Sequence, residues 1–284
     1  MNFILTAIIV LTAIAFVAAL ILFYCSKKFH VQEDPRLEQV NQALPGANCG
    51  GCGYPGCSGL ATALVKGADN GDIKGLFCPV GGNETMGEIA HILGVETHAA
   101  EPQVAVLRCN GACDKRPRVA SYDGFRTCAI LNSCTSGETQ CDYGCLGCGD
   151  CVKACQFGAI TMNNETQLPQ VDEAKCTACG ACVKVCPRNL LELRNKGFKN
   201  RRVYVACSNK SIGAVAIKNC KAACIGCSKC FKECAFDAIK IENNLSYIDF
   251  NKCKLCRKCV NVCPTGAIKA VNFPQKQTVE EAKA

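Results

Sequence analysis

One cysteine pattern occurs four times in this chain of 284 residues, and it constrains the fold more than any other feature of the sequence. Each copy reads Cys-x2-Cys-x2-Cys-x3-Cys, and the copies begin at residues 145, 176, 224 and 253. The first two copies begin 31 residues apart and the last two 29 apart, whereas the two pairs begin 79 apart. This arrangement indicates two tandem modules, each with an internal duplication.

The spacing within each copy is that of the bacterial ferredoxin runs that bind [4Fe-4S] clusters. Three thiolates on one tight loop can reach three irons of one cube, and the fourth points towards the partner cube. We therefore predict four sites, each of which combines three cysteines of one run with the last cysteine of its partner run. They are site 2 (Cys145, Cys148, Cys151, Cys186), site 3 (Cys155, Cys176, Cys179, Cys182), site 4 (Cys224, Cys227, Cys230, Cys263) and site 5 (Cys234, Cys253, Cys256, Cys259).

Two β-hairpins are predicted between the runs. Residues 159–162 (AITM) and 168–172 (LPQVD) flank a polar turn in the first module, and residues 238–241 (AIKI) and 246–249 (SYID) flank an Asn-Asn turn in the second. The modules are therefore expected to be small α+β units in which clusters replace much of a hydrophobic core.

A different cysteine motif lies nearer the N-terminus. It reads Cys49-x2-Cys52-x4-Cys57, followed by Cys78, and its glycines allow the backbone to fold closely around a cube. We predict a [4Fe-4S] site here, called site 1, and a helix that leaves it through residues 60–65. A four-cysteine zinc site is the alternative. The glycines also spell GxGxxG, but no strand precedes them and cysteines interleave with them, so a dinucleotide site is not expected.

Eight cysteines lie outside these five sites, and several of them crowd between residues 109 and 141. Thiols at this density favour a further cluster, so the chain is expected to hold at least five [4Fe-4S] clusters, or six with this one. The predicted ligands are Cys109, Cys128 and Cys141, with one of Cys113, Cys207 or Cys220 as the fourth.

An uncharged apolar segment covers residues 3–24. As a helix it would span about 33 Å, enough to cross a hydrocarbon core of about 30 Å. No basic residue precedes it and no small-x-small cleavage site follows it, so a membrane anchor is favoured over a signal peptide. Lys27 and Lys28 follow directly, which predicts a single-pass protein of the inner (cytoplasmic) membrane with its N-terminus outside and its cysteine-rich domains in the cytoplasm. That reducing compartment disfavours disulfides.

Composition supports several small domains rather than one large core. Cysteine accounts for 28 residues, tryptophan is absent, and three histidines leave little for mixed zinc sites. We predict an α+β chain with an N-terminal transmembrane helix, a small four-cysteine iron–sulfur domain and two tandem ferredoxin modules. The predicted boundaries are 1–28 for the anchor, 29–95 for the four-cysteine domain, 96–140 for a cysteine-rich connecting segment, 141–195 for the first ferredoxin module, 196–219 for a linker, 220–272 for the second module and 273–284 for the tail.

The order of these parts resembles the B subunits of the Rnf electron-transport complexes over essentially the whole chain. The stretches that carry the resemblance are ALPGANCGGCGYPGC, RCNGAC, CDYGCLGCGDCVKAC and CKAACIGC. The second ferredoxin module is found in only part of that family. The resemblance implies a membrane complex, a translocase, that oxidises reduced ferredoxin, reduces NAD and exports sodium ions or protons.

Within such a complex the chain is predicted to be an electron-transfer component. It has no nucleophile–base constellation and no phosphate loop, so we expect no catalytic residue, no flavin and no nucleotide on this chain. The implied partners are other membrane and flavin-bearing subunits, soluble ferredoxin as the electron donor, and the lipid bilayer. Two alternatives stay open: an anchored polyferredoxin of a hydrogenase or other oxidoreductase, and the branch of the family that keeps a redox-sensing transcription factor reduced.

The formal charge of +8 raises a further alternative, which is nucleic-acid binding. Each oxidised cube with its four thiolates carries about −2, so five cubes bring the chain near neutrality. We therefore expect no nucleic-acid partner, and consider that basic clusters guide an acidic ferredoxin. The clusters considered are Lys199, Arg201 and Arg202, and Lys115, Arg116 and Arg118.

Overall fold

The computed structural model describes residues 2–28, 34–97 and 99–274, so most of the predicted tail lies outside the described residues. The helices are α1 (Asn2–Lys28), α2 (Pro35–Ala43), α3 (Cys57–Asp69), α4 (Gly82–Leu93), α5 (Cys128–Cys134), α6 (Asp150–Lys153), α7 (Ala181–Val185), the 3-10 turn η1 (Phe198–Asn200), α8 (Gly213–Asn219), α9 (Lys229–Lys232) and α10 (Lys258–Asn261). The strands are β1 (Gln103–Leu107), β2 (Ile160–Met162), β3 (Pro169–Val171), β4 (Leu191–Asn195), β5 (Arg202–Val205), β6 (Ile239–Glu242), β7 (Leu245–Ile248) and β8 (Ile268–Val271).

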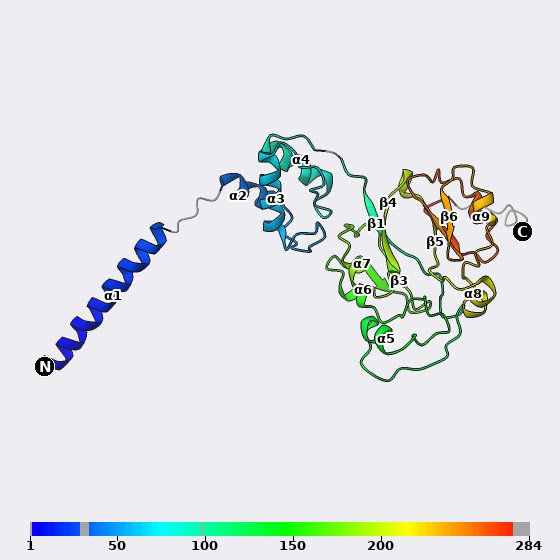
Figure 1. The fold of residues 1–284 in the computed structure, drawn as a ribbon, viewed down its shortest axis with the longest axis horizontal. Coiled ribbons are helices and arrows are strands. Elements are labelled where there is room, and N and C mark those ends of the chain that lie inside the picture. Colours follow the sequence, from blue (N-terminus) through cyan, green and yellow to red (C-terminus); the bar gives the residue numbers. More distant parts are fainter. Residues whose placement is uncertain (1, 29–33, 98, 275–284) are drawn as a thin grey trace, which may run out of the picture.

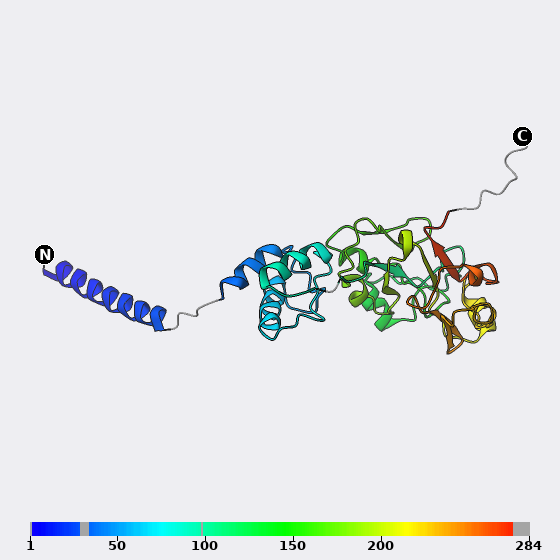
Figure 2. The same ribbon diagram turned by 90° about the horizontal axis from the view of Figure 1, so that it is seen from above.

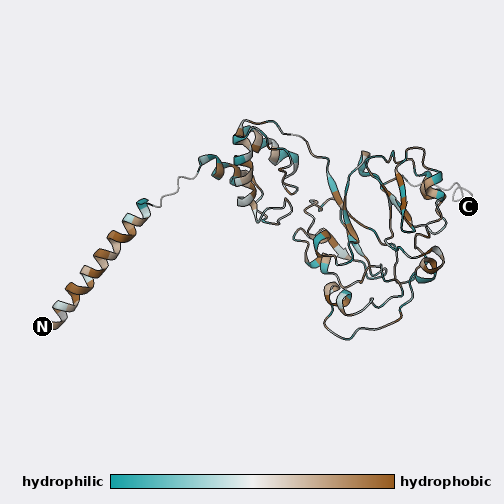
Figure 3. Cartoon of the chain, viewed as in Figure 1, coloured by the Kyte–Doolittle hydropathy of each residue, from teal (hydrophilic) through white to brown (hydrophobic). Residues whose placement is uncertain are grey.

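The predicted apolar helix is confirmed as α1, whose apolar colouring continues along its length in Figure 3. The segment Leu5–Lys28 is long and apolar enough to cross a membrane. Its most apolar part is not buried against any other part of the described chain. Lys27 and Lys28 lie in the last turn, where positive charge is favourable next to the C-terminal end of the helix dipole.

Helices α2, α3 and α4 pack together into a small helical unit (Figure 1). The side chain of Asp34 caps α2 by accepting a hydrogen bond from the backbone N–H of Arg36. The core of the unit contains fully buried Val40, Leu60 and Ile89, at most 1% exposed. Cys57, the first residue of α3, packs against this core, and the bounds of α3 confirm the helix predicted to leave site 1.

Two modules with the same topology follow, and Figures 1 and 2 show them beyond the helical unit, at the end of the molecule away from α1. In module 1 (103–195) the outer strands β1 and β4 pair antiparallel, and so do the inner strands β2 and β3. In module 2 (202–271) the same holds for β5 with β8 and for β6 with β7. The two predicted tandem modules therefore share one pattern of strand pairing.

Both predicted hairpins are confirmed. Ile160 pairs with Val171 in the first, and Ile239 with Ile248 in the second. The second turn consists of Asn243 and Asn244 at φ 49° and 59°, both left-handed, as a two-residue type I′ turn requires.

Two segments predicted as connections contain outer strands of the modules. Strand β1 lies within the predicted connecting segment 96–140, and β5 and α8 lie within the predicted linker 196–219. Each module therefore begins with an outer strand and carries an inserted segment before its first cysteine run.

The two modules meet around a buried guanidinium. Arg194 on β4 is 1% exposed and donates to the carbonyl oxygen of Ile248 on β7 at 3.0 Å. Its guanidinium carbon lies 5.1 Å from the ring centre of Tyr247 and 5.6 Å from that of Phe250. Glu192 on the same strand pairs with it. A buried charge that is paired, hydrogen-bonded and stacked in this way favours one relative placement of the modules.

Candidate iron–sulfur centres

In module 2 the cysteines predicted for sites 4 and 5 line two separate hollows. One hollow is lined by the four cysteines of site 4, and the other by the four cysteines of site 5. The walls between the thiols are apolar, with Ile241 and Ile268 at site 4 and Ile239 and Ile248 at site 5. Each hollow therefore combines three cysteines of one run with the last cysteine of the other, which suits a cube bound by thiolates.

In module 1 a hollow is lined by Cys145, Cys151 and Cys186 of site 2. At site 3, burial raises the pKa of the Cys182 thiol to about 12, and the neighbouring Cys176 and Cys179 add to the rise. Free thiols of this kind stay protonated at neutral pH, so iron binding must release their protons.

One backbone conformation recurs in all four runs. The residue after the second cysteine has a positive φ of 61–80° and caps the short helix that carries the third cysteine. For residues other than glycine this left-handed conformation costs about 1–2 kcal/mol. In module 2 residues other than glycine adopt this conformation in spite of its cost. This indicates that the loop shape is needed to orient the thiols towards the cluster site. The four residues are Gly149, Gly180, Ser228 and Arg257.

Backbone N–H groups point at several of the sulfurs. The Sγ atoms of Cys155 and Cys186 accept from the N–H of the residue four positions on, at 3.3 and 3.4 Å. Cys78 accepts from Gly81 at 3.4 Å. Hydrogen bonds of this kind favour the thiolate form that binds iron and influence cluster potentials.

Site 1 is formed by a loop and two helix ends of the helical unit. The backbone N–H of Cys57 donates to Oδ1 of Asn48 at 2.8 Å, which ties the start of α3 to the loop that carries Cys49 and Cys52. Cys78 is buried, and burial raises its pKa, with Cys57 and Cys52 adding to the rise. Three of the four predicted ligands thus share one core.

No group of three or more His, Cys, Asp or Glu side chains in the described ranges is set closely enough to hold a single metal ion. The iron–sulfur prediction for site 1 does not depend on such a close arrangement.

Of the cysteines outside the five sites, the structure gathers a different set from the one predicted. Cys128 lies next to site 2, where it lines the same hollow and contributes after burial to the raised pKa of Cys148. Cys113 and Cys134 are exposed. Four other cysteines are buried close to one another, two from each module, so their grouping depends on packing between parts of the chain that are far apart in sequence. They are Cys109, Cys141, Cys207 and Cys220.

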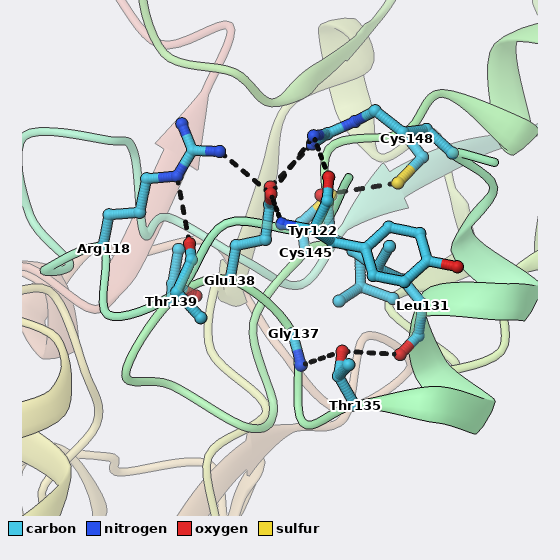
Figure 4. A network of polar contacts seen from close by, with 12 residues as sticks. Arg118, Tyr122, Leu131, Thr135, Gly137, Glu138, Thr139, Cys145 and Cys148 are labelled. Carbon is cyan, nitrogen blue, oxygen red and sulfur yellow. Dashed lines mark hydrogen bonds and ion pairs between the residues drawn. The ribbon is translucent and has the colours of Figure 1, made fainter. Parts of the chain in front are cut away.

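A charged network holds the inserted segment of module 1 beside site 2 (Figure 4). The carboxylate of Glu138 receives Arg126 at 2.6 Å, Arg118 at 2.9 Å and the backbone N–H of Tyr122 at 2.8 Å. The hydrogen bond from Arg126 is the main reason that the pKa of Glu138 falls to about 2. The network therefore stays charged at every physiological pH, and it keeps Arg126 near Cys148.

Each basic cluster considered for nucleic acid has one buried arginine. Arg116 and Arg202 are each 5% exposed, and Arg202 is paired with Glu173. Lys199 and Arg118 are exposed, and Arg118 is paired with Glu138.

The apolar helix, the four-cysteine loop and the two ferredoxin-type modules define a class of protein, the membrane-anchored electron carriers with several iron–sulfur centres. Three known families match parts of the chain: "4Fe-4S dicluster domain" over residues 144–190, "Putative Fe-S cluster" over residues 44–72 and "4Fe-4S binding domain" over residues 246–269.

Relatives similar along nearly the whole chain identify the family. The chain is 41% identical to the B subunit of the Na(+)-translocating ferredoxin:NAD(+) oxidoreductase complex of Acetobacterium woodii, over 94% of this chain and 78% of that protein. It is 38% identical to the proton-translocating counterpart of Clostridium ljungdahlii, over 100% of this chain and 99% of that protein. It is also 38% identical to the B subunit of the ion-translocating oxidoreductase complex of Methanosarcina acetivorans, over 94% and 98%. The chain belongs to this family, the B subunits of the Rnf complexes, as the sequence resemblance predicts.

Proposed function

We propose that the chain carries electrons from reduced ferredoxin towards the membrane part of a complex that reduces NAD and exports sodium ions or protons. The names of the relatives support this reaction, and they pair the same kind of subunit with sodium in one organism and protons in another. Sites 1 to 5 are proposed to hold one [4Fe-4S] cluster each, in the ligand sets predicted from the runs. A [4Fe-4S] cluster accepts and releases one electron at a time.

The observation that carries the proposal is the direct contact between the helical unit and module 1. A Cβ placed on Gly51 would lie 2.6 Å from the carbonyl oxygen of Cys179, so the loops of sites 1 and 3 touch through their backbones. The Nζ of Lys184 also donates to the carbonyl oxygen of Gly50 at 3.0 Å. Cysteine loops that touch keep the distance between neighbouring centres short, as an electron carrier requires.

The row of cysteine groups has one end near the anchor and the other in module 2. Site 1 belongs to the unit that follows α1 in the chain, and sites 4 and 5 lie in module 2. We infer that electrons arrive at module 2 from a soluble donor and leave from site 1 to a partner protein in the bilayer.

Module 2 offers a surface that suits an acidic donor. Cys227 of site 4 is exposed, and Lys229 and Lys232 of the adjoining helix are exposed with it. Phe231 between them is 50% exposed. Positive charge beside an accessible centre steers a negatively charged protein, and an exposed aromatic ring provides apolar contact area.

Reversal of both lysine charges, Lys229→Glu with Lys232→Glu, is expected to slow reduction of the chain by reduced ferredoxin about tenfold or more at low salt. The difference should shrink as salt is added, because screening removes the steering. The measurement is stopped-flow bleaching of the iron–sulfur absorbance. The matched control is Lys66→Glu with Lys74→Glu, two exposed lysines of the helical unit. Equal rates for the two variants at low salt would contradict docking on module 2.

The proposed sidedness is tested with reporters. We expect a reporter that functions only in the cytoplasm to be active when fused after residue 284, and one that functions only outside to be inactive there. The physical reason is the pair Lys27 and Lys28 at the end of α1, which favours retention of that end on the cytoplasmic side. The opposite pattern would place the cysteine-rich part outside and overturn the proposed route from a soluble cytoplasmic donor.

A further inference from the structure

Four buried cysteines that belong to none of the five sites meet where the two modules join. We propose that these four, called the central group, bind a sixth [4Fe-4S] cluster that is shared by the two modules. The proposal rests on the proposed function, because it adds a centre to the same electron carrier. The central group is Cys109 (7% exposed), Cys141 (5%), Cys207 (8%) and Cys220 (5%).

The two modules have the same order of elements, and this places the four cysteines at equivalent positions in the two modules. Cys109 lies two residues after the end of β1, and Cys207 lies two residues after the end of β5. Cys141 stands four residues before the first cysteine of its module's first run, and Cys220 does the same in module 2. Each module therefore contributes the same two positions, and the two halves together give the four thiols that a cube needs.

Two residues of the inserted segments contact the sulfurs in pairs. A Cβ placed on Gly111 would lie 3.2 Å from Sγ of Cys220 and 3.7 Å from Sγ of Cys109, so both sulfurs face this glycine. Asn209, which is 1% exposed, donates from its backbone N–H to Sγ of Cys207 at 3.4 Å and from Nδ2 to Sγ of Cys141 at 3.8 Å. Each contact pair joins a sulfur of one module to a sulfur of the other.

Hydrogen bonds between the inserted segments hold the two halves in register. The Oγ of Ser208 donates to the carbonyl oxygen of Arg108 at 3.2 Å, beside Cys207 and Cys109. The backbone N–H of Lys221 donates to the carbonyl oxygen of Lys115 at 2.8 Å. The module interface is thus built around the central group.

A buried positive charge next to the group lacks a negative partner. Arg116 is 5% exposed, its Cδ lies 3.3 Å from the position of a Gly111 Cβ, and its buried Nε has no hydrogen-bond partner among the described residues. The ion pairs found in the described ranges do not include Arg116. A cube bound by four thiolates is an anion and would supply the missing counter-charge.

The central group also lies between site 2 of module 1 and site 4 of module 2. Cys109 packs in one cluster of buried side chains with Cys145 and Cys186 of site 2. Cys207 and Cys220 pack in another with Cys224 of site 4. A cluster bound here would connect module 1 with module 2 and make one continuous row from site 5 to site 1.

The test is iron and acid-labile sulfide per chain in the anaerobically purified full-length protein. With four irons per cube, the unmodified chain is expected to contain about 24 irons. The half variants Cys109→Ala with Cys141→Ala, and Cys207→Ala with Cys220→Ala, should each contain about 20, and the combination of all four substitutions should also contain about 20. The matched control Cys113→Ala with Cys134→Ala removes two exposed thiols and should keep the full content.

The outcomes separate this proposal from the one it rests on. About 20 irons in the unmodified chain would remove the sixth cluster and leave the five others, and about 24 in the combined variant would show that these four cysteines hold no cluster. Half variants with the full iron content would also overturn the proposal. Fewer than about 16 irons in the unmodified chain would instead reject the ferredoxin runs and the proposed function. The count in the unmodified chain needs no variant, so the test stands even where a variant fails to fold.

Discussion

An Rnf-type complex in which this chain carries Cys49→Ala and Cys52→Ala is expected to lose ferredoxin-dependent NAD reduction down to background. The chain should still be reduced by ferredoxin, because sites 4 and 5 lie in module 2 and do not involve the helical unit. Iron content should fall by about four per chain. The helical unit should stay folded, because Cys52 only packs against the core from its edge, whereas buried residues such as Leu60 and Leu64 form the core itself.

Two measurements on the same preparation check this expectation: NAD reduction by the whole complex, and bleaching of the iron–sulfur absorbance by reduced ferredoxin. The control Cys113→Ala with Cys134→Ala should match the unmodified complex in both. Unchanged NAD reduction in the site 1 variant would mean that electrons reach the membrane subunits without site 1. Loss of both signals would mean that site 1 is needed for assembly rather than for transfer.

Features set by residues close together in the chain could be predicted from the sequence. The four cysteine runs and both inner hairpins are of this kind, because the ligand spacing and the turn residues lie within a few positions of one another. The Asn243–Asn244 turn illustrates this, since asparagine tolerates the positive φ angles that a two-residue hairpin turn requires.

Features set by long-range packing could not be predicted in this way. Gln103 on β1 pairs with Asn195 on β4, 92 residues on, and nothing in the short segment QVAVL identifies its partner. The same limit explains why the sequence prediction places Cys128 in the sixth site. Nearness in sequence favours it, whereas the fold brings Cys109 and Cys141 to Cys207 and Cys220 across the module interface. The signal that could have found this group is its repetition, because Cys141 and Cys220 each precede a run by four residues.

The duplication also gives a physical reason for the inserted segments. In module 1 the segment between β1 and the first run is anchored by Glu138 and its two arginines, and in module 2 it contains α8. Both segments lead their terminal cysteines to one place between the modules. We interpret them as the parts that join two ferredoxin units into one carrier, with the buried Arg194 fixing another part of the interface.

Substitution of Gly51 by alanine is expected to separate the helical unit from module 1 while leaving site 1 able to bind its cluster. Gly51 is not among the glycines with positive φ, so an alanine fits its local backbone. Its Cβ, however, would lie 2.6 Å from the carbonyl oxygen of Cys179 and 3.0 Å from the Cys179 Cα, and backbone atoms cannot move aside as a side-chain end can. Overpacking of this kind costs about 1–3 kcal/mol, which lowers the equilibrium constant for docking about fivefold to 150-fold. Ferredoxin-dependent NAD reduction should fall accordingly, with iron content unchanged.

Two alanine controls separate the contact from other effects of losing a glycine. Gly53→Ala lies in the same loop at φ 88° with nothing within 4 Å of the new Cβ, so it strains the loop without touching module 1. Gly87→Ala lies within α4, also in open space, and should be neutral or slightly stabilising because alanine is the better helix former. If the contact matters, Gly51→Ala slows NAD reduction while the iron content stays full. Any effect of Gly53→Ala on NAD reduction should come with a loss of iron. Gly87→Ala should change neither NAD reduction nor iron content. Full activity in Gly51→Ala would show that sites 1 and 3 need not touch for electrons to pass between the helical unit and module 1.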